Sequence, residues 1–293
     1  RDAQESRGLG DVYKRQVFAD RVDVVINKPY LALGADLSPQ EQMTVLSLLG
    51  LSDINVDDYD IISITNADEH EYLDKYLDAS IIGTRALSSV LVVGKEAGNG
   101  IHVTTKNISY CTEGMYRNAL LTAGIEDADI TVAGPFSISG TAALVGAIKA
   151  YETMTGEEID DENLDAANDE LVLTGKLVED IGDSEKAEDL MALVKQEVAE
   201  NKLTSAEDIQ NVVDQACDQL DIQLSEENQK QIAELMKKIE GLDLDVDKLK
   251  DQAKDLYQKL ENLDFHVDKE SVGNFFTRII DAIVKFFQGL FGK

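Results

Sequence analysis

The sequence contains no tryptophan, only three prolines and only two cysteines among its 293 residues. Scarce proline is compatible with a helix-rich chain, because proline breaks a helix interior. Two cysteines are too few for the disulfide framework of a small secreted domain. Cys111 and Cys217 fall in different halves of the chain. They could pair in an oxidising compartment, but two separate buried thiols is the interpretation we favour.

Basic residues are also scarce. The chain has 27 Lys and Arg against 57 Asp and Glu, which gives a formal net charge of −30. So few cations argue against nucleic-acid binding, because a protein binds the phosphate backbone by displacing its counterions with basic groups. An acidic surface instead favours solubility and attracts cations or basic partners. Residues 156–293 hold 15 basic and 35 acidic residues, so the first half is closer to an ordinary globular surface.

The sequence lacks the spacing of familiar catalytic motifs. His70 and Glu71 begin like the zinc-protease motif, but Asp74 stands where the second histidine is required. There is no nucleophile elbow and no full phosphate-binding loop. We therefore expect no catalytic residue and no cofactor, and we favour a protein that is not an enzyme.

A calcium site is weakly indicated. Asp53, Asn55 and Asp57 resemble the first ligands of a calcium loop. The glycine that such a loop needs next is Asp58, and Ile64 replaces its final glutamate. The three residues remain metal candidates, with a solvated acidic loop as the plainer alternative.

The first 29 residues are predicted to lie outside the fold. Asp11–Gln16 resembles the translation of a transposon end used in sequencing libraries, so we treat residues 1–16 as a non-native scar. Val17–Ala19 fits the small-x-Ala pattern that precedes a signal-peptidase cut. Residues 17–29 are therefore predicted to be a truncated signal-peptide remnant or linker, which implies an extracytoplasmic protein. A simple loop explains Val17–Ala19 equally well.

Residues 30–156 alternate strand and helix patterns, which predicts an α/β domain, with α+β as the alternative. Ser38 as cap, Pro39 at the first helical position and Glu41 three residues after the cap mark one helix start. Strands are expected at 30–35, 59–64, 88–93, 101–105 and 129–133, and further helices at 66–77, 112–123 and 140–154. Asn66 is expected to cap the first of these, and strands 88–93 and 101–105 to pair as an antiparallel hairpin.

Two parts of this domain repeat one pattern. Residues 37–65 and 111–133 each give a capped helix, a glycine, a linker and a strand. Because each follows a predicted strand, we expect two βαβ-like units in one sheet.

Five stretches of this domain carry a family resemblance. They are GADLSPQEQMTVLSLLGL, ITNADE, IGTRALSSVLV, GIHVTTKNISYCTEGMYRNALLTAGI and especially ITVAGPFSISGTAALVGAIKAYE. They resemble the YpuA-like secreted proteins of Gram-positive bacteria, the domain of unknown function numbered 1002. The resemblance covers residues 30–152 well and the remainder more loosely. It implies an exported protein without an assigned function, and it supplies no catalytic residues.

Residues 157–269 are predicted to form an acidic helical bundle of antiparallel hairpins. Amphipathic patterns cover 164–181 and 186–199, and Ser205 and Ser225 are placed to cap two further helices. Leu249 begins a heptad pattern that is too short for a confident coiled coil.

Residues 270–293 differ because their predicted helix is apolar around most of its circumference. Arg278, Asp281 and Lys285 lie on one narrow polar stripe. Such a helix suits a membrane surface or a protein partner, although it could also be the last core helix of the bundle. The docking residues would be Phe275, Phe276, Ile279, Ile280, Ile283, Phe286, Phe287, Leu290 and Phe291. The oligomeric state is not predictable.

The remaining candidate site is the serine-rich turn between the last predicted strand and helix of the α/β domain. Ser137, Ser139, Gly140 and Thr141 could hold an anion with backbone N–H groups, although helix capping is the plainer role. Our leading hypothesis is an exported, non-catalytic interaction module that docks through its C-terminal helix. The alternative is a secreted hydrolase with a site assembled near residues 137–141 and 66–69.

Overall fold

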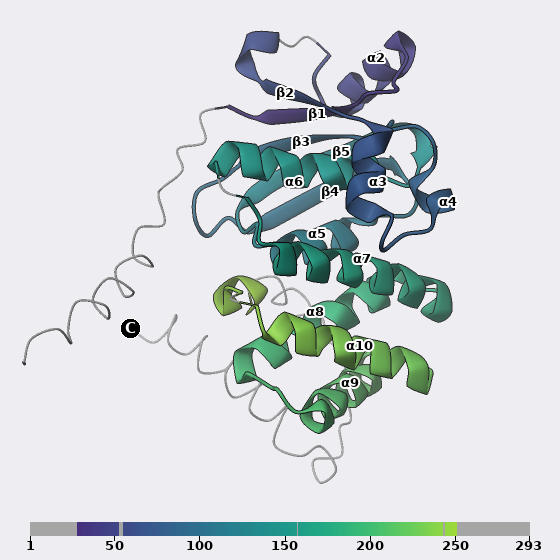
Figure 1. Ribbon diagram of the computed structural model, residues 1–293, viewed down its shortest axis with the longest axis vertical. Coiled ribbons are helices and arrows are strands. Elements are labelled where there is room, and N and C mark those ends of the chain that lie inside the picture. Colours follow the sequence, from purple (N-terminus) through teal and green to yellow (C-terminus); the bar gives the residue numbers. More distant parts are fainter. Residues whose placement is uncertain (1–27, 53–54, 157, 243, 251–293) are drawn as a thin grey trace, which may run out of the picture. The chain divides into compact units, whose positions relative to one another are not determined.

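The computed structural model describes residues 28–52, 55–156, 158–242 and 244–250, all within one compact unit of the chain (Figure 1). The α/β half contains β1 (Tyr30–Gly34), α2 (Pro39–Leu48), the 3-10 helix η1 (Val56–Asp58), β2 (Asp60–Ile64), α3 (Asn66–Leu73), α4 (Ala79–Ile82), β3 (Ser89–Gly94), β4 (Ile101–Ile108), α5 (Glu113–Thr122), β5 (Ala128–Ile138) and α6 (Thr141–Thr155). The helices α7 (Asp161–Ile181), α8 (Ser184–Asn201), α9 (Ala206–Leu220) and α10 (Glu226–Glu240) follow.

The five strands form one mixed sheet in the order β2-β1-β3-β5-β4. β1 and β2 are parallel neighbours joined through α2, and β4 and β5 are parallel neighbours joined through α5. These are the two predicted βαβ units. β3 lies between them and runs antiparallel to both β1 and β5. The predicted fold class is thus confirmed.

The predicted hairpin of residues 88–93 and 101–105 is wrong. Both strands exist, but β5 lies between β3 and β4 and pairs with each of them. The connection of residues 95–100 is long enough to pass two strand spacings, each about 4.8 Å. β5 lies between β3 and β4, where its Ile130 and Val132 are buried among core residues from both of these strands.

Side-chain caps set the helix starts. Ser38 and Glu41 form the complete capping box of α2, as predicted. The cap of α3 is Thr65 rather than Asn66, one residue earlier than predicted. Thr65 has the extended backbone that a cap requires, and it forms a reciprocal capping box with Asp68.

The helices of the two βαβ units lie on opposite faces of the sheet. Val45 of α2 packs with Leu31 of β1 in one cluster. Met115 of α5 instead shares the larger core cluster with Ala32, the next residue of β1. Because successive strand residues point to opposite faces, the two units repeat a sequence pattern without repeating its packing. α6 lies on the larger core and packs against β1 and β3 (Figure 1).

β5 is longer than predicted and continues through Gly134 and Pro135 to Ile138. Its pairing with β3 ends at Ala133, and beyond that point only β4 is its neighbour. Proline lacks an N–H to donate, so it is tolerated in a strand where one side is unpaired. Ser137 therefore lies in a strand and not in a turn.

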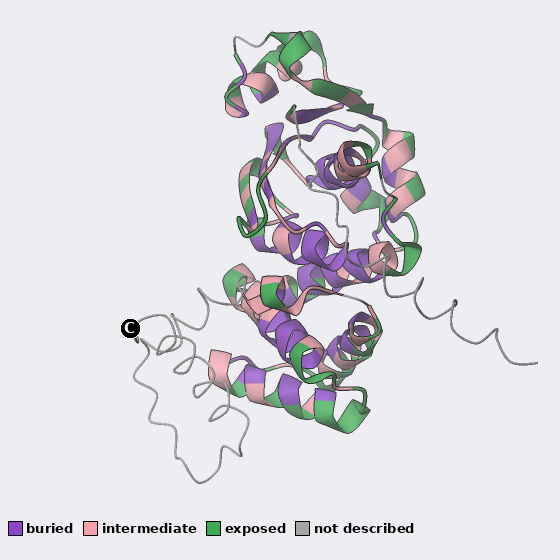
Figure 2. Ribbon diagram, turned by 90° about the vertical axis from the view of Figure 1, so that its left-hand side faces the viewer, coloured by how far each residue is buried: buried purple, intermediate pink, exposed green. Residues whose placement is uncertain are grey.

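The helical half packs onto the α/β half through α7, which contacts α5 and contributes Leu171 to the larger core cluster. Long stretches of α6 and α7 are buried, and Figure 2 shows buried residues on the sheet and on the helices packed against it. The predicted boundary at residue 156 falls between these two helices. A fully buried ion pair between Lys195 of α8 and Glu170 of α7 lies beside α5.

The remaining structural predictions divide between described and undescribed residues. Cys111 and Cys217 are separate buried thiols. Leu249 is buried, whereas the rest of its heptad pattern, from Ala253 on, lies outside the described residues. The scar, nearly all of the leader remnant and the C-terminal helix also lie outside them. Among the helices that the structure describes, none has both the length and the hydrophobicity needed to cross a membrane.

Candidate functional site

A cavity of about 470 Å³ lies at one edge of the sheet. β1, β2, β4 and β5 all point the same way, because β3 is antiparallel to its two neighbours. Their carboxyl ends therefore meet at one edge, where open α/β sheets characteristically bind ligands. The lining residues are Glu69, Ser80, Ile81, Ile82, Gly83, Thr84, Arg85, Leu87, Ser88, Ser109, Tyr110, Phe136, Ile138, Ser139 and Thr141.

These residues come from segments that follow the ends of the parallel strands. α3 follows β2 and supplies Glu69, while Ser109 and Tyr110 follow β4. The end of β5 and the start of α6 supply residues 136–141, and the segment from α4 to β3 supplies residues 80–88. The cavity is thus assembled from four stretches that are distant in sequence.

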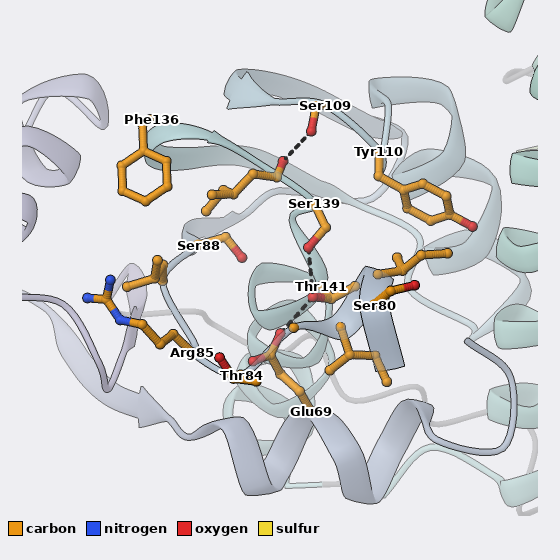
Figure 3. Close-up of a pocket in the computed structure, with 15 residues that line it drawn as sticks. Glu69, Ser80, Thr84, Arg85, Ser88, Ser109, Tyr110, Phe136, Ser139 and Thr141 are labelled. Carbon is orange, nitrogen blue, oxygen red and sulfur yellow. Dashed lines mark hydrogen bonds between the residues drawn. The ribbon is translucent and has the colours of Figure 1, made fainter. Parts of the chain in front are cut away.

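A chain of hydrogen bonds runs from the cavity wall into the protein (Figure 3). The Ser139 hydroxyl lies 3.2 Å from the Thr141 hydroxyl, which donates a 2.7 Å hydrogen bond to Glu69 Oε1. The Asn66 amide donates to Glu69 Oε2 at 3.1 Å. Since Thr141 donates to the carboxylate, its oxygen is left to accept the proton of Ser139.

Glu69 is only 1% exposed, and this burial raises the pKa of its carboxyl above the ordinary value. Its contact with Thr141 places it beside the first residue of α6. The cap of that helix, Gly140, has no side chain to satisfy the N-terminal N–H groups. A carboxylate near a helix N-terminus is favourable because the helix dipole is positive there. Glu69 therefore supplies the negative charge that the end of α6 favours.

The first turn of α6 is further fixed by α5 and by the residue that precedes β3. The Ala143 N–H donates to the Ser88 hydroxyl at 2.9 Å, and the Tyr116 hydroxyl donates to the Gly140 carbonyl at 2.6 Å. Gly140 has a φ of +99°, which is unfavourable for any residue with a Cβ. These hydrogen bonds therefore fix the first turn of α6, which forms the floor of the cavity through Thr141.

The one cationic side chain among the described lining residues is turned away from the cavity. The guanidinium of Arg85 donates to the Asp36 carbonyl at 2.8 Å and to Glu41 at 3.0 Å. Figure 3 shows the rings of Phe136 and Tyr110 on opposite sides of the hydroxyl groups. Phe136 is 49% exposed. Tyr110 is more buried, and this burial raises the pKa of its hydroxyl to about 12. The lining thus combines hydroxyls, two aromatic rings and one buried carboxyl.

Residues 33–256 match the family described as a protein of unknown function (DUF1002). The chain belongs to this family. It is 38% identical over 271 residues to the uncharacterized protein YpuA of Bacillus subtilis strain 168, covering 91% of this chain and 92% of that protein. No solved structure matches the chain. The resemblance expected from the sequence is therefore confirmed.

In this DUF1002 chain, the predicted residues of the serine-rich turn are only partly brought together. Ser139 and Thr141 line the cavity, whereas Ser137 and Gly140 do not. Glu69, from the 66–69 stretch named with the hydrolase alternative, joins them. Anion binding there stays a prediction, and the group beside Thr141 is the protein's own carboxyl.

Sequence analysis missed the contributions of residues 80–88, Ser109, Tyr110 and Phe136. Ser88 and Ser89 in the middle of an apolar stretch were the available signal, since buried serines in a strand need partners. The calcium candidates Asn55 and Asp57 lie around η1, but Asp53 is outside the described residues. Within the described part of the chain, no group of three or more His, Cys, Asp or Glu could hold a metal ion. The C-terminal docking residues lie outside it.

Proposed function

We propose that the α/β domain is a non-catalytic binding module that holds a small molecule in the cavity at the carboxyl edge of its sheet. The observation that carries this proposal is the cavity itself. Its volume of about 470 Å³ falls in the range of roughly 300–1,000 Å³ that small-ligand sites occupy. It also opens where α/β sheets bind ligands, and its floor is fixed by hydrogen bonds rather than left to a loop.

The chemistry of the lining favours binding over the hydrolase alternative. A serine hydrolase needs a base beside its nucleophile, and a glycosidase needs two carboxyl groups across the scissile bond. Among the described lining residues, Glu69 is the one carboxyl, and there is no histidine or lysine. Glu69 reaches Ser139 only through Thr141, whose hydroxyl is not a base at neutral pH.

The binding module acts outside the cytoplasm and attaches through residues 274–293 to a membrane surface or a protein partner. The support is the sequence pattern: ten apolar positions surround one narrow polar stripe with Arg278 and Lys285. Flotation with liposomes containing anionic lipid tests the membrane arm, using the full chain and a chain that ends at Gly273. Equal flotation of the full and shortened chains would refute attachment to a membrane through residues 274–293. Cell fractionation of the relative's producing organism tests export.

Affinity selection followed by mass spectrometry tests the cavity. The full chain is mixed with small molecules from a culture supernatant and a cell-wall digest, and compounds that co-elute with it are identified. Thr84→Trp fills the cavity from an exposed position of its wall, whereas Ser47→Trp changes an exposed position on α2. We expect retained compounds with the wild type and Ser47→Trp and their loss with Thr84→Trp. Equal retention by both variants, or no retained compound, refutes the proposal.

A further inference from the structure

We infer that the ligand of this cavity is a neutral carbohydrate, held by the hydroxyl side chains of its wall between the rings of Phe136 and Tyr110. This inference rests on the proposed binding function and adds the chemical class of the ligand. Three properties of the described lining carry it: its charge, its hydrogen-bonding groups and its aromatic surface.

The charge of the lining selects against ionic ligands. The Arg85 guanidinium is paired with Glu41 and points away from the cavity (Figure 3), so no cation is presented to an anionic ligand. Both oxygens of Glu69 already accept hydrogen bonds, from Thr141 and Asn66. Glu69 is also only 1% exposed, so its carboxyl presents little open surface to a cationic ligand.

The hydrogen-bonding groups match a polyhydroxyl compound. Six of the lining side chains are serine or threonine, and each hydroxyl can donate one hydrogen bond and accept two. Ser88 accepts from the Ala143 N–H, which leaves its own proton to donate. Ser109 donates to the Ile138 carbonyl, which leaves its lone pairs to accept. The wall therefore offers both donors and acceptors, as the hydroxyls of a sugar do.

Two further hydroxyls are available. Those of Ser80 and Thr84 have no hydrogen-bond partner among the described residues, and neither is a buried unsatisfied group. Exposed polar groups of this kind are hydrated in the free protein. A sugar hydroxyl can replace that water without loss of hydrogen bonds, whereas an apolar ligand cannot.

The aromatic rings supply the apolar contact. Phe136 is one of three exposed large hydrophobic residues in the described part of the chain, with Met43 and Ile61, and it alone of these lines the cavity. The C–H groups of a pyranose ring form apolar patches on its faces, and an aromatic ring face is the surface that covers such a patch. Tyr110 faces the cavity from the other side (Figure 3), and its hydroxyl lies toward Gly175 of α7. Its ring is therefore held in position.

The test measures binding of defined saccharides to the full chain by ligand-observed NMR and calorimetry. The neutral probes are cellobiose, maltose and N,N′-diacetylchitobiose, and the charged probes are cellobiouronic acid, glucose 6-phosphate and glucosamine. We expect at least one neutral disaccharide to bind more tightly than every charged probe. Its affinity should change little between about 20 and 500 mM salt, because salt screens only charged interactions.

Matched variants locate the binding. Phe136→Ala should weaken binding of the best neutral disaccharide about fivefold, which corresponds to about 1 kcal/mol. Met43→Ala should not, because Met43 is exposed on α2 and does not line the cavity. Thr84→Val should weaken it about threefold, and Thr44→Val, also on α2, should leave it unchanged.

The inference is overturned if a charged probe binds best, if no neutral saccharide binds, or if Phe136→Ala and Met43→Ala behave alike. Affinity selection separates this failure from failure of the proposed function. Compounds retained through the cavity but anionic in class refute the carbohydrate and leave the binding module standing. If Thr84→Trp retains every compound that the wild type retains, both the carbohydrate inference and the proposed binding function are refuted.

Discussion

Replacing Lys195 by methionine should destabilise the protein by about 3–5 kcal/mol, the typical cost of removing one partner of a buried ion pair. Lys195 and Glu170 are both fully buried, and their charged atoms lie 3.0 Å apart. Lys195 also donates to the Asn118 carbonyl at 3.0 Å and to the Thr122 hydroxyl at 3.1 Å. Burial lowers the pKa of Lys195, and the charge of Glu170 opposes this shift. Methionine fills a similar volume, so the loss comes from an uncompensated carboxylate rather than from a cavity.

A double variant separates the pair from the packing. Lys195→Met combined with Glu170→Leu removes both charges, and its stability should return to within about 1–2 kcal/mol of the wild type, because an apolar replacement of a buried pair is often neutral. Lys230→Met is the control. Its ion pair with Glu234 is 3.7 Å long and exposed on α10, so its loss should stay below about 0.5 kcal/mol.

The assay is urea unfolding followed by far-ultraviolet circular dichroism, because the chain has no tryptophan to serve as a fluorescent probe. Midpoint and slope together give the free energy of unfolding. A loss below about 1 kcal/mol for Lys195→Met would show that the buried carboxylate finds another partner or takes up a proton at little cost. A double variant as unstable as the single one would assign the effect to packing. Either result would refute the reasoning.

Three further perturbations are predicted. Because the pKa of Glu69 is raised in the folded protein, the Glu69 carboxyl stabilises the fold fully below its ordinary pKa of 4.5, and this contribution is lost as the pH rises through the raised pKa. Glu69→Gln should therefore flatten this part of the profile of urea stability against pH. The pKa of Asp68 is lowered to about 2, mainly by its hydrogen bond from Lys149, so Asp68 stabilises the fold above its ordinary pKa and this contribution is lost as the pH falls toward 2. Asp68→Ala should cost about 1–2 kcal/mol of unfolding free energy at pH 7, because the cap of α3 also loses its partner. An unchanged urea midpoint would contradict this. Gly140→Ala should cost about 1–3 kcal/mol, since φ is +99° and the new Cβ would lie 2.6 Å from the Tyr116 hydroxyl; a melting temperature equal to the wild type would show that the turn rearranges freely.

Local signals predicted most of the elements, and non-local geometry accounts for the principal error. The start of α2 follows from Ser38, Pro39 and Glu41, which act within one turn of the chain. The one-residue shift at Thr65 arose because two neighbouring residues can both cap a helix, and the backbone angles decide between them. The order of β3, β5 and β4 depends on which strands bury their faces together, and a contiguous pair of β-rich runs does not contain that information.

The cavity shows the same division between local and non-local information. Ser139 and Thr141 could be singled out from sequence because a polar turn between a strand and a helix is a local pattern. The segments around Ser80 and Ser109 carry no periodicity, and only the common direction of the parallel strands brings them to the same edge. Residues that contribute through topology alone look like ordinary polar loops in a single sequence.

The start of α6 shows how a correct local signal can be answered by a residue that is distant in the sequence. A helix whose cap is a glycine leaves N–H groups that favour a negative charge, and the sequence therefore left an anion as a candidate there beside plain helix capping. Thr141 instead donates to Glu69, 72 residues earlier in the chain. Because Glu69 supplies this negative charge from within the protein, the remaining wall presents no charge to the cavity and is rich in hydroxyls. The folded position of this carboxyl is therefore what supports our proposal of an uncharged, hydrogen-bonding ligand.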